Sequence, residues 1–374
     1  MSNKKHKKRI MFAISTTRAG GAEVHCTRLV EYMANLQEYE VALLCFYKSD
    51  LWEAPKNVKT YYVGSRKEAS LIKRFWRIRA AIKDFNPDLI NAWNPEIMSL
   101  SVAFWGRLLG IKTITSRLVA HKSIFKGGLL REYLNLLADL LGDGIISNSP
   151  VDETDSYIFK KVFDSRKNIV IKNGIDPFIP QHTEAAYLNL IDSDKNFKII
   201  YAGRFTKVKR LDILLKAFFK LKAAGHGISL YLCGGQENDL LSCSKLLDEN
   251  KKYKSDIHFL GFQKYWRDFG RHCNLFISPS ENEGLSNSIL EAMSLGLPII
   301  VSNIRPNAQV CDDCKNALLF EVNNAESLAE SIKRIMSDES LRETLSAGAL
   351  EKSKEFSISE MSESYLRFFE EYMR

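Results

Sequence analysis

Short apolar runs alternate along the whole chain with longer segments whose apolar positions keep helical spacing. Continuous apolar runs of this kind are typical of strands buried on both faces, as in a parallel sheet covered by helices. In the first half they predict strands at residues 9–15, 41–46, 88–92 and 112–115, with further runs at 143–149 and 169–171. Periodicity near 3.6 residues predicts helices at residues 22–36, 67–85, 97–109 and 129–141.

The same alternation restarts after residues 177–196, a polar stretch that we interpret as a hinge. It predicts strands at residues 198–202, 228–233, 256–260, 275–278 and 297–301, a helix at 210–223, and final helices near 325–336, 339–354 and 358–373. The predicted fold class is therefore α/β, with two tandem Rossmann-like, doubly wound parallel-sheet domains. A ligand of such domains meets the carboxyl ends of the strands.

The length of the chain also favours two domains, because 374 residues exceed the size at which one hydrophobic core keeps growing. Its 45% hydrophobic and 26% charged residues are typical of a globular protein and exclude a disordered one. No apolar run approaches the roughly 18–20 residues that span a bilayer. The run at residues 10–14, behind a basic start, is too short for the core of a signal peptide. We therefore expect a cytoplasmic protein.

Seven cysteines are scattered through the chain, which argues against a disulfide framework. Cys311 and Cys314 have the spacing of a zinc or redox pair, but no second pair and no Cys/His group accompanies them. We expect two unpaired thiols there and no bound metal.

Positive charge gathers in the first half of the chain. Residues 1–177 contain 28 Lys and Arg against 18 Asp and Glu, a net +10, whereas residues 178–374 contain 25 against 27, a net −2. A positive field favours anionic partners. Much of this charge lies in and just before one predicted helix, at Arg66, Lys67, Lys73, Arg74, Arg77, Arg79 and Lys83.

The apolar positions of that helix, residues 71, 75, 78, 82 and 85, keep helical spacing. The simplest interpretation is a helix with this stripe on the core and a solvated basic face. The alternative is contact with an anionic membrane surface, because basic amphipathic helices bind anionic lipid. The sequence contains no nucleic-acid recognition module, so we expect no nucleic-acid partner.

The segment from Glu283 to Glu291 carries the strongest chemical signal. Its two carboxylates stand eight positions apart, and Gly284-Leu285-Ser286 between them opens an apolar helix. Such a turn leaves backbone N–H groups unpaired at the helix N-terminus, which suits a phosphate or a sugar hydroxyl. Glu291 can accept hydrogen bonds from the diol of a ribose. The alternative is a surface loop that leads into a core helix.

A second group of candidates follows the predicted strand at residues 198–202. Gly203 and Arg204 come directly after it, and Lys209 stands five residues beyond Arg204. Arg offers a planar charged fork and Lys a compact point charge, a combination that suits a diphosphate.

Two glycine pairs also follow predicted strands. Gly234 and Gly235 come after residues 228–233, where the backbone must approach something closely. Gly20 and Gly21 lie between the first strand and its helix, where a phosphate or sugar could dock. A tight turn without a ligand explains Gly20 and Gly21 equally well.

Together these residues resemble one family. The chain is similar to retaining glycosyltransferases of the GT-B fold, of the family 4 type (glycosyl transferases group 1). The resemblance is carried by Gly20-Gly21-Ala22-Glu23, Pro87-Asp88-Leu89-Ile90, Ser147-Asn148-Ser149, Asn173-Gly174-Ile175-Asp176, Gly203-Arg204 with Lys209, the run from Leu211 to Phe218, and the Glu283–Glu291 segment. It implies an N-terminal acceptor-binding domain at 1–177 and a C-terminal donor-binding domain at 178–355. It also implies a C-terminal helix at 356–374 that packs back on the N-terminal domain.

The resemblance implies a role for each matching residue. Arg204 and Lys209 match the pair that binds the donor diphosphate and stabilises charge on the leaving group. Glu291 matches the carboxylate on the nucleotide ribose, and Glu283 matches the one that faces the donor sugar. The remaining donor-binding positions are Gly20, Gly21, Gly203, Gly234, Gly284, Leu285 and Ser286. Such enzymes need no metal and no cofactor beyond the nucleotide-diphosphate sugar, which is a co-substrate.

The family often has a histidine or an acid near the reacting centre, after a strand of the first half. His121 fits this catalytic position by chemistry and Arg117 by its place in the chain, and a solvated loop residue is an equal alternative. Arg210 replaces a common glycine, where it either adds positive charge near the phosphates or caps the helix. Gln309 and Ala317 replace a glutamate and a glycine, which leaves the choice of sugar open.

The function implied is transfer of a hexosyl group, with retention, from a nucleotide-diphosphate sugar to a lipid-linked or cell-surface polysaccharide precursor. With such an acceptor, the positive charge of the first half favours a cytoplasmic protein that associates with the inner face of the cell membrane. The enzymatic alternatives are a GT-B enzyme with a soluble acceptor, of the sucrose-phosphate-synthase type, and a sugar-nucleotide 2-epimerase. A third alternative is an inactive GT-B scaffold subunit, against which the intact Arg204, Lys209, Glu283 and Glu291 argue.

Overall fold

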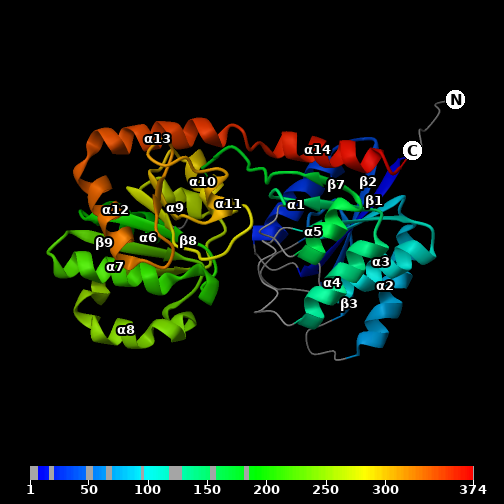
Figure 1. Ribbon diagram of the computed structural model, residues 1–374, viewed down its shortest axis with the longest axis horizontal. Helices are drawn as coiled ribbons and strands as arrows, with labels where there is room; N and C mark the ends of the chain where they lie inside the picture. Colours follow the sequence, from blue (N-terminus) through cyan, green and yellow to red (C-terminus); the bar gives the residue numbers. More distant parts are fainter. Residues whose placement is uncertain are drawn as a thin grey trace. The chain divides into compact units, whose positions relative to one another are not determined.

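The computed structural model describes residues 7–16, 21–47, 54–64, 70–93, 97–117, 129–151, 157–180 and 185–373. Gly20 and His121, two of the predicted site residues, lie outside these ranges. The chain divides into an N-terminal unit, Met1–Gly174 with Ile358–Arg374, and a C-terminal unit, Ile175–Ser357. Each unit is built around one parallel sheet flanked by helices (Figure 1), which confirms the predicted α/β fold class.

In the described residues, the N-terminal unit has a seven-stranded parallel sheet in the order β3-β2-β1-β4-β5-β6-β7. The strands are β1 (Lys8–Thr16), β2 (Tyr39–Tyr47), β3 (Lys59–Gly64), β4 (Leu89–Trp93), β5 (Lys112–Arg117), β6 (Gly144–Ser147) and β7 (Lys167–Val170). The helices are α1 (Gly21–Ala34), α2 (Leu71–Phe85), α3 (Ile97–Leu108), α4 (Leu129–Leu141), α5 (Tyr157–Asp164) and α14 (Ile358–Glu370). The order reverses beside β1, as in a doubly wound sheet.

Strand β1 shows why its sequence is a continuous apolar run. Ile10, Phe12 and Ile14 belong to a core that includes α1 and α14, whereas Met11 and Ala13 belong to a core that includes α2 and α3. Both faces of the strand are therefore covered, and neither set of alternate positions can be polar.

Helix α14, at the end of the chain, packs on the N-terminal unit. The ring of Tyr365 stacks on Trp93 at 5.5 Å, and the ring of Phe369 lies 6.0 Å from Phe12. All four side chains are buried. The last helix therefore completes the core of the first unit. This is the packing that the sequence resemblance implies for a C-terminal helix.

The described part of the C-terminal unit has a six-stranded parallel sheet in the order β10-β9-β8-β11-β12-β13. The strands are β8 (Phe197–Ala202), β9 (Ile228–Cys233), β10 (Ile257–Gly261), β11 (Leu275–Ser278), β12 (Ile299–Ser302) and β13 (Leu318–Phe320). The helices are α6 (Ala185–Ser193), α7 (Leu211–Ala223), α8 (Ser244–Glu249), α9 (Trp266–Gly270), α10 (Asn287–Ser294), α11 (Arg305–Ala308), α12 (Ala325–Ser337) and α13 (Glu339–Ser353). Short 3-10 turns lie at η2 (Lys207–Lys209), η3 (Glu237–Cys243) and η4 (Lys251–Asp256).

The sheet of the C-terminal unit is likewise covered on both faces. Ile199 and Tyr201 of β8 belong to a core that includes α7 and α12. Ile200 and Ala202 belong to a core that includes α9 and α10.

The predicted hinge at residues 177–196 is wrong in part, because it contains helix α6 (Ala185–Ser193). Ile191 of this helix is fully buried in the core of the C-terminal unit. A helix of nine residues shows fewer than three turns of periodicity, and polar neighbours on both sides hide its apolar face.

The apolar stripe predicted for the basic helix is also wrong at its N-terminal end. Helix α2 buries Ile78, Ile82 and Phe85 as predicted, but Leu71 is exposed. Arg74 takes the buried place in the first turn, where its guanidinium donates a hydrogen bond to the Tyr47 hydroxyl at 2.8 Å. The stripe therefore fails at Leu71, whereas Phe75 packs partly buried against the core.

Candidate functional site

Backbone hydrogen bonds made by glycines join the carboxyl ends of β8, β9 and β10. Gly203, directly after β8, donates its N–H to the Cys233 carbonyl at 2.9 Å, and Gly234 donates its N–H to the Gly261 carbonyl at 2.6 Å. Gly234 has φ +130°, and a Cβ there would lie 2.0 Å from the Gly203 carbonyl oxygen. Only glycine fits at this position, so the close approach predicted for Gly234 is to a neighbouring backbone segment.

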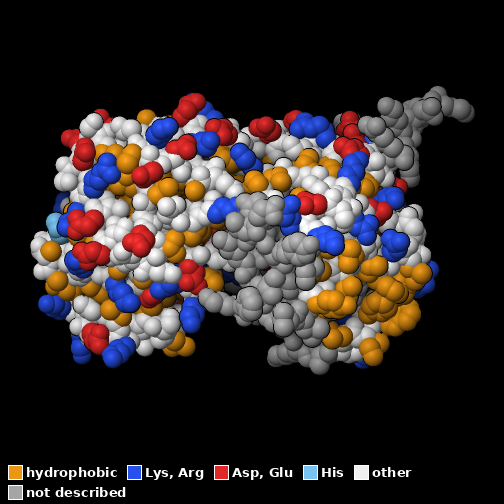
Figure 2. All heavy atoms as spheres, viewed as in Figure 1, with side chains coloured by type: hydrophobic (Ala, Val, Ile, Leu, Met, Phe, Trp, Pro, Cys, Tyr) orange, Lys and Arg blue, Asp and Glu red, His pale blue; other side chains and the backbone are white. Residues whose placement is uncertain are grey.

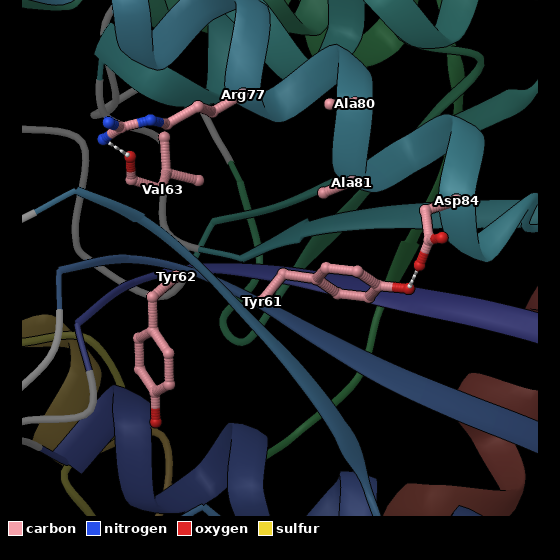
Figure 3. A pocket seen from close by; sticks show the side chains of 7 residues that line it. All are labelled: Tyr61, Tyr62, Val63, Arg77, Ala80, Ala81 and Asp84. Carbon is pink, nitrogen blue, oxygen red and sulfur yellow. Dashed lines mark hydrogen bonds between the residues drawn. The ribbon is translucent and has the colours of Figure 1, made fainter.

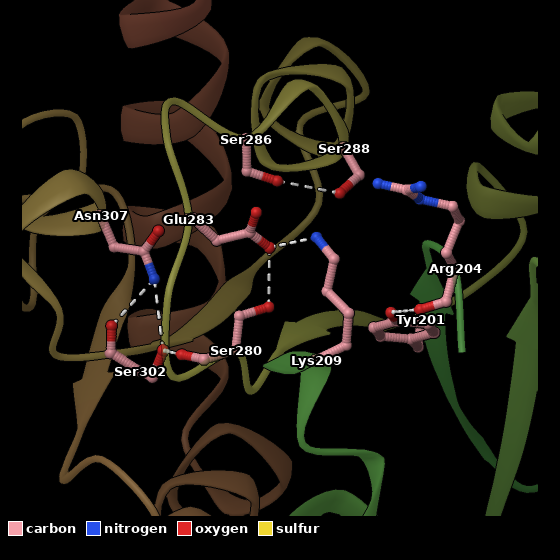
Figure 4. A network of polar contacts seen from close by, with 9 residues as sticks. All are labelled: Tyr201, Arg204, Lys209, Ser280, Glu283, Ser286, Ser288, Ser302 and Asn307. Atoms are coloured by element: carbon pink, nitrogen blue, oxygen red, sulfur yellow. Dashed lines mark hydrogen bonds and ion pairs between the residues drawn. The ribbon is translucent and has the colours of Figure 1, made fainter. Parts of the chain in front are cut away.

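Arg204 and Lys209 follow β8 as the sequence predicts. Arg204 is exposed, and its carbonyl accepts a hydrogen bond at 3.1 Å from the buried Tyr201 hydroxyl, which fixes the backbone beneath it. In Figure 4 the Arg204 guanidinium extends toward Ser288 of α10. Lys209 ends the η2 turn and points toward Glu283 (Figure 4).

Glu283 is held by two donors. Lys209 Nζ forms an ion pair with Glu283 Oε1, and Ser280 Oγ donates a hydrogen bond at 2.7 Å to the same oxygen. The Lys209 and Glu283 side chains are only 18% and 13% exposed. Each side chain of this largely buried pair supplies a partner of opposite charge for the other. Burial raises the pKa of the Tyr201 hydroxyl well above its ordinary value, and the nearby charge of Glu283 raises it further.

A buried polar network holds the loop that carries Glu283. Ser302 Oγ donates to the Ser280 carbonyl, and Asn307 Nδ2 donates to the Ser302 carbonyl at 2.9 Å (Figure 4). Ser280, Ser302 and Asn307 are all buried. The N–H of Glu281 donates to the Val208 carbonyl at 2.9 Å, which ties the loop to the η2 turn. The relative position of Lys209 and Glu283 is therefore set by backbone on both sides.

Arg210 stands at the N-cap position of α7, with acidic side chains around its guanidinium. Its contribution of charge near the phosphates stays a prediction. Its guanidinium forms two hydrogen bonds of 2.9 Å with Asp212 and pairs with Glu281 at 3.1 Å. These acids raise the pKa of Arg210, and Arg210 lowers the pKa of Asp212. The side chain does not cap α7. Its φ of +49° is a left-handed conformation that glycine adopts without cost, which explains why a glycine suits this position.

Glu291 lies on α10 and accepts a hydrogen bond from a residue that the sequence analysis missed. Trp266 Nε1 donates to Glu291 Oε2 at 2.8 Å, and the Trp266 ring is buried against Phe276 at 5.5 Å. A buried indole N–H needs an acceptor. The sequence signals that need but does not reveal that the acceptor lies 25 residues further along the chain.

The predicted Gly284-Leu285-Ser286 turn leads directly into α10, with Ser286 as its N-cap residue. The Ser286 hydroxyl contacts the Ser288 hydroxyl at 3.1 Å (Figure 4) and does not cap the helix. The Leu285 side chain is buried in the core of the unit. The loop follows β11, and β11 and β9 are the two neighbours of β8. The predicted residues of the C-terminal unit therefore follow three adjacent strands.

The N-terminal candidates are placed only in part. Gly21 begins α1, while Gly20 and His121 lie outside the described residues. Arg117, the alternative to His121, is buried at the end of β5, and its guanidinium pairs with Asp139 of α4. Asp139 also accepts a hydrogen bond of 2.7 Å from the Thr115 hydroxyl. The Arg117 charge is thus compensated within the core.

A pocket in the N-terminal unit lies between the edge strand β3 and helix α2 (Figure 3). It is lined by Tyr61, Tyr62, Val63, Arg77, Ala80, Ala81 and Asp84, none of which was a predicted site residue. Arg77 donates to the Val63 carbonyl at 2.9 Å, and Asp84 accepts from the Tyr61 hydroxyl at 2.6 Å. Arg77, Tyr61 and Asp84 therefore already make hydrogen bonds within the lining of the pocket.

Two features are absent from the residues that the structure describes. No three or more His, Cys, Asp or Glu side chains gather there into a group that could hold a metal ion. No helix in that part of the chain is long and apolar enough to cross a membrane.

Two family models match the chain. The model described as Glycosyl transferases group 1 matches residues 189–352, and the model described as Glycosyltransferase Family 4 matches residues 19–177. The first match falls in the C-terminal unit and the second in the N-terminal unit, apart from three residues.

Similar proteins span nearly the whole chain. An uncharacterized glycosyltransferase of Methanocaldococcus jannaschii is 27% identical over 350 residues, which cover 90% of this chain and 91% of that protein. The N,N'-diacetylbacillosaminyl-diphospho-undecaprenol alpha-1,3-N-acetylgalactosaminyltransferase of Campylobacter jejuni is 22% identical over 316 residues, which cover 81% and 82%. A lipopolysaccharide core biosynthesis glycosyltransferase of Rhizobium meliloti is 24% identical over 358 residues, which cover 93% and 95%.

Two solved structures have a similar fold. HepE of Anabaena in complex with UDP-glucose has a TM-score of 0.79 at 17% identity, covering 97% of this chain and 99% of that one. Sucrose-phosphate synthase of Thermosynechococcus elongatus has a TM-score of 0.79 at 19% identity, covering 98% and 99%.

Proposed function

Because the chain belongs to the glycosyltransferases of the family 4 type and has the GT-B fold, we propose that it transfers a sugar, with retention of configuration, from a nucleotide-diphosphate sugar to an acceptor. The observation that carries the proposal is the arrangement of Arg204 and Lys209, beyond the carboxyl end of β8, with Glu283, beyond that of the adjacent strand β11. Two cations suit a diphosphate, and a carboxylate beside them suits the hydroxyls of the attached sugar.

In this proposal Arg204 and Lys209 bind the diphosphate and stabilise the charge that develops as it leaves. Lys209 Nζ has three N–H donors, so it can hold Glu283 and a phosphate oxygen together. The sugar–phosphate bond breaks while the acceptor oxygen bonds to the anomeric carbon on the same face. The acceptor proton passes to the leaving phosphate. The two cations supply the positive charge, so we expect the reaction to proceed without a metal.

The remaining predicted donor contacts are part of the same proposal. Glu291 binds the ribose diol, and the backbone N–H groups of Gly284, Leu285 and Ser286 bind phosphate or sugar hydroxyls at the start of α10. Gly20 and Gly21 are proposed to lie beneath the diphosphate, and His121 to act near the reacting carbon.

The acceptor that we propose is a lipid-linked precursor of a surface polysaccharide. The Campylobacter jejuni relative is named for a diphospho-undecaprenol acceptor, and the net charge of +10 in residues 1–177 favours an anionic one. We place the protein in the cytoplasm, at the inner membrane face. The similarity to sucrose-phosphate synthase keeps a soluble acceptor as the second candidate.

Nucleotide binding is the first test of this function. Wild type and Glu291→Ala are heated with UDP, GDP, ADP and their sugar conjugates, and the melting temperature of each is measured. A ligand at about 100 times its Kd stabilises the folded state by roughly 2.7 kcal/mol. We expect one nucleotide to raise the melting temperature of wild type but not of Glu291→Ala. If none does, the inactive scaffold becomes the better interpretation.

Trp266→Phe tests how Glu291 is held. The change keeps an aromatic ring but removes the indole N–H that donates to Glu291. A hydrogen bond to a charged group contributes about 1.5–3 kcal/mol, so we expect donor KM to rise roughly tenfold or more while kcat changes little. In a Glu291→Ala background the same change should have no further effect on KM. Equal losses in both backgrounds would show that Trp266 acts only through packing.

A further inference from the structure

Helices α2 and α3 expose large apolar side chains on a single surface. Leu71, Ile72 and Trp76 of α2 and Phe104 and Leu108 of α3 are between 43% and 74% exposed. Figure 2 shows hydrophobic side chains gathered over these helices. We call these five residues the α2–α3 apolar face. Contiguous exposed apolar surface of this kind marks a site of interaction with a partner or a membrane.

Aromatic contacts hold the two helices together beneath this face. The Phe75 ring lies 5.6 Å from Phe104 and 4.8 Å from Trp105, and the Trp76 ring lies 5.3 Å from Trp105. The buried Trp105 indole donates a hydrogen bond to the Phe75 carbonyl at 3.0 Å. The α2–α3 apolar face is therefore exposed in a defined geometry that packing enforces.

Positive charge surrounds the face. Lys73, Lys83 and Arg107 are exposed on the same two helices, and within the described residues none of them pairs with a carboxylate. The Arg79 guanidinium lies over the rings of Trp76 and Trp105, at 5.8 Å and 5.3 Å. Asp84, the acid on α2, is already paired with Lys59 at 2.7 Å.

The positive charge around the α2–α3 apolar face indicates which partner binds there. A second copy that docks the same face would bring like charges together, which costs free energy. An anionic bilayer offers an apolar interior for the five side chains and phosphates for the cations around them. Tryptophan is enriched at the interface of such bilayers because its ring is apolar and its N–H polar. Trp76, 54% exposed, offers such a ring on this face.

We propose that the α2–α3 apolar face inserts into an anionic membrane leaflet while Lys73, Arg79, Lys83 and Arg107 contact lipid headgroups. This inference rests on the proposed function in that a lipid-linked acceptor requires the enzyme at a bilayer. It differs from docking by charge alone, because insertion adds a contribution that salt does not screen. Salt should therefore weaken vesicle binding without abolishing it.

The test is co-sedimentation of the full chain with phosphatidylcholine vesicles that contain either no phosphatidylglycerol or roughly a third of it. We expect wild type to bind the anionic vesicles, and Ile72→Ser with Trp76→Ser to reduce that binding roughly tenfold or more at every salt concentration. Leu241→Ser is the matched control, because Leu241 is 80% exposed on the C-terminal unit. Lys73→Gln with Lys83→Gln should lower binding mainly at low salt.

Insertion also has a spectroscopic signature. Acyl chains brominated near the headgroup should quench wild-type fluorescence, and Trp76→Phe should remove most of that quenching. Equal binding of wild type and the double serine variant would overturn the proposal. So would a wild-type dimer that the double serine variant abolishes, because the face would then be an interface between copies.

This test is separable from that of the proposed function. Nucleotide binding, measured by the rise in melting temperature, involves none of the five residues of the α2–α3 apolar face and should be the same in wild type and in the double serine variant. Urea unfolding followed by circular dichroism, without ligand, reports whether both units of that variant are folded. Loss of vesicle binding with nucleotide binding intact supports the membrane inference. Absence of nucleotide binding in wild type would instead contradict the proposed function.

Discussion

Lys209→Ala should lower the kcat of sugar transfer by about 10²–10³-fold, the cost of removing one donor that stabilises developing charge. In the folded protein Lys209 Nζ already forms an ion pair with Glu283. Buried hydrogen bonds hold the loop that carries Glu283. The Lys209 charge is therefore positioned before the donor arrives. Initial rates with a radiolabelled nucleotide sugar, over a range of donor concentrations, separate kcat from KM.

Lys207→Ala is the matched control for Lys209→Ala. Lys207 lies in the same η2 turn and is exposed, and no carboxylate pairs with it within the described residues. We expect its kcat to stay within about twofold of wild type, because an exposed charge is screened. A kcat for Lys209→Ala close to that of Lys207→Ala would remove Lys209 from the mechanism.

The second large effect is on stability. Asp139→Ala should lower the free energy of unfolding by about 3–5 kcal/mol, because it leaves the buried Arg117 guanidinium without its counter-charge. It also removes the acceptor of the Thr115 hydroxyl. Urea unfolding of the full chain, followed by circular dichroism and tryptophan fluorescence, measures the shift in midpoint.

A control variant and a double variant test this explanation of the stability loss. Asp164→Ala breaks an exposed pair with Lys160 in the same unit, so it should cost less than about 1 kcal/mol. Arg117→Met combined with Asp139→Leu removes both charges, and should recover most of the stability. If Asp139→Ala cost no more than Asp164→Ala, the pair would not be buried in solution. Arg117 would then return as a candidate for the reacting centre.

The fold class could be predicted because burial on both faces of each sheet leaves a direct record in the sequence. Strand β1 is apolar at successive positions since Phe12 faces α14 while Met11 faces α2 and α3. Short or one-sided elements leave a weaker record. Helix α6 is hidden among polar residues, and in α2 the buried Arg74 displaces the expected apolar stripe.

The candidate site could be predicted only as far as it is local in sequence. Arg204 and Lys209 follow one strand, and Glu283 opens the turn before α10, so their residue types and spacing were visible. Contacts between residues far apart in the sequence were not visible. Trp266 of α9 donates to Glu291 of the neighbouring helix α10, and Arg210 pairs with acids from two segments. No pattern within a short window encodes such pairings.

The position of α14 has a consequence for how the protein is made. The ribosome synthesises Phe12 and Trp93 first, yet Tyr365 and Phe369, which cover them, emerge only after the whole C-terminal unit. The C-terminal unit can complete its core during synthesis, but the N-terminal unit cannot. The unit whose synthesis begins first is therefore the last to complete its core, and until α14 is made it presents an open apolar face that chaperones can bind.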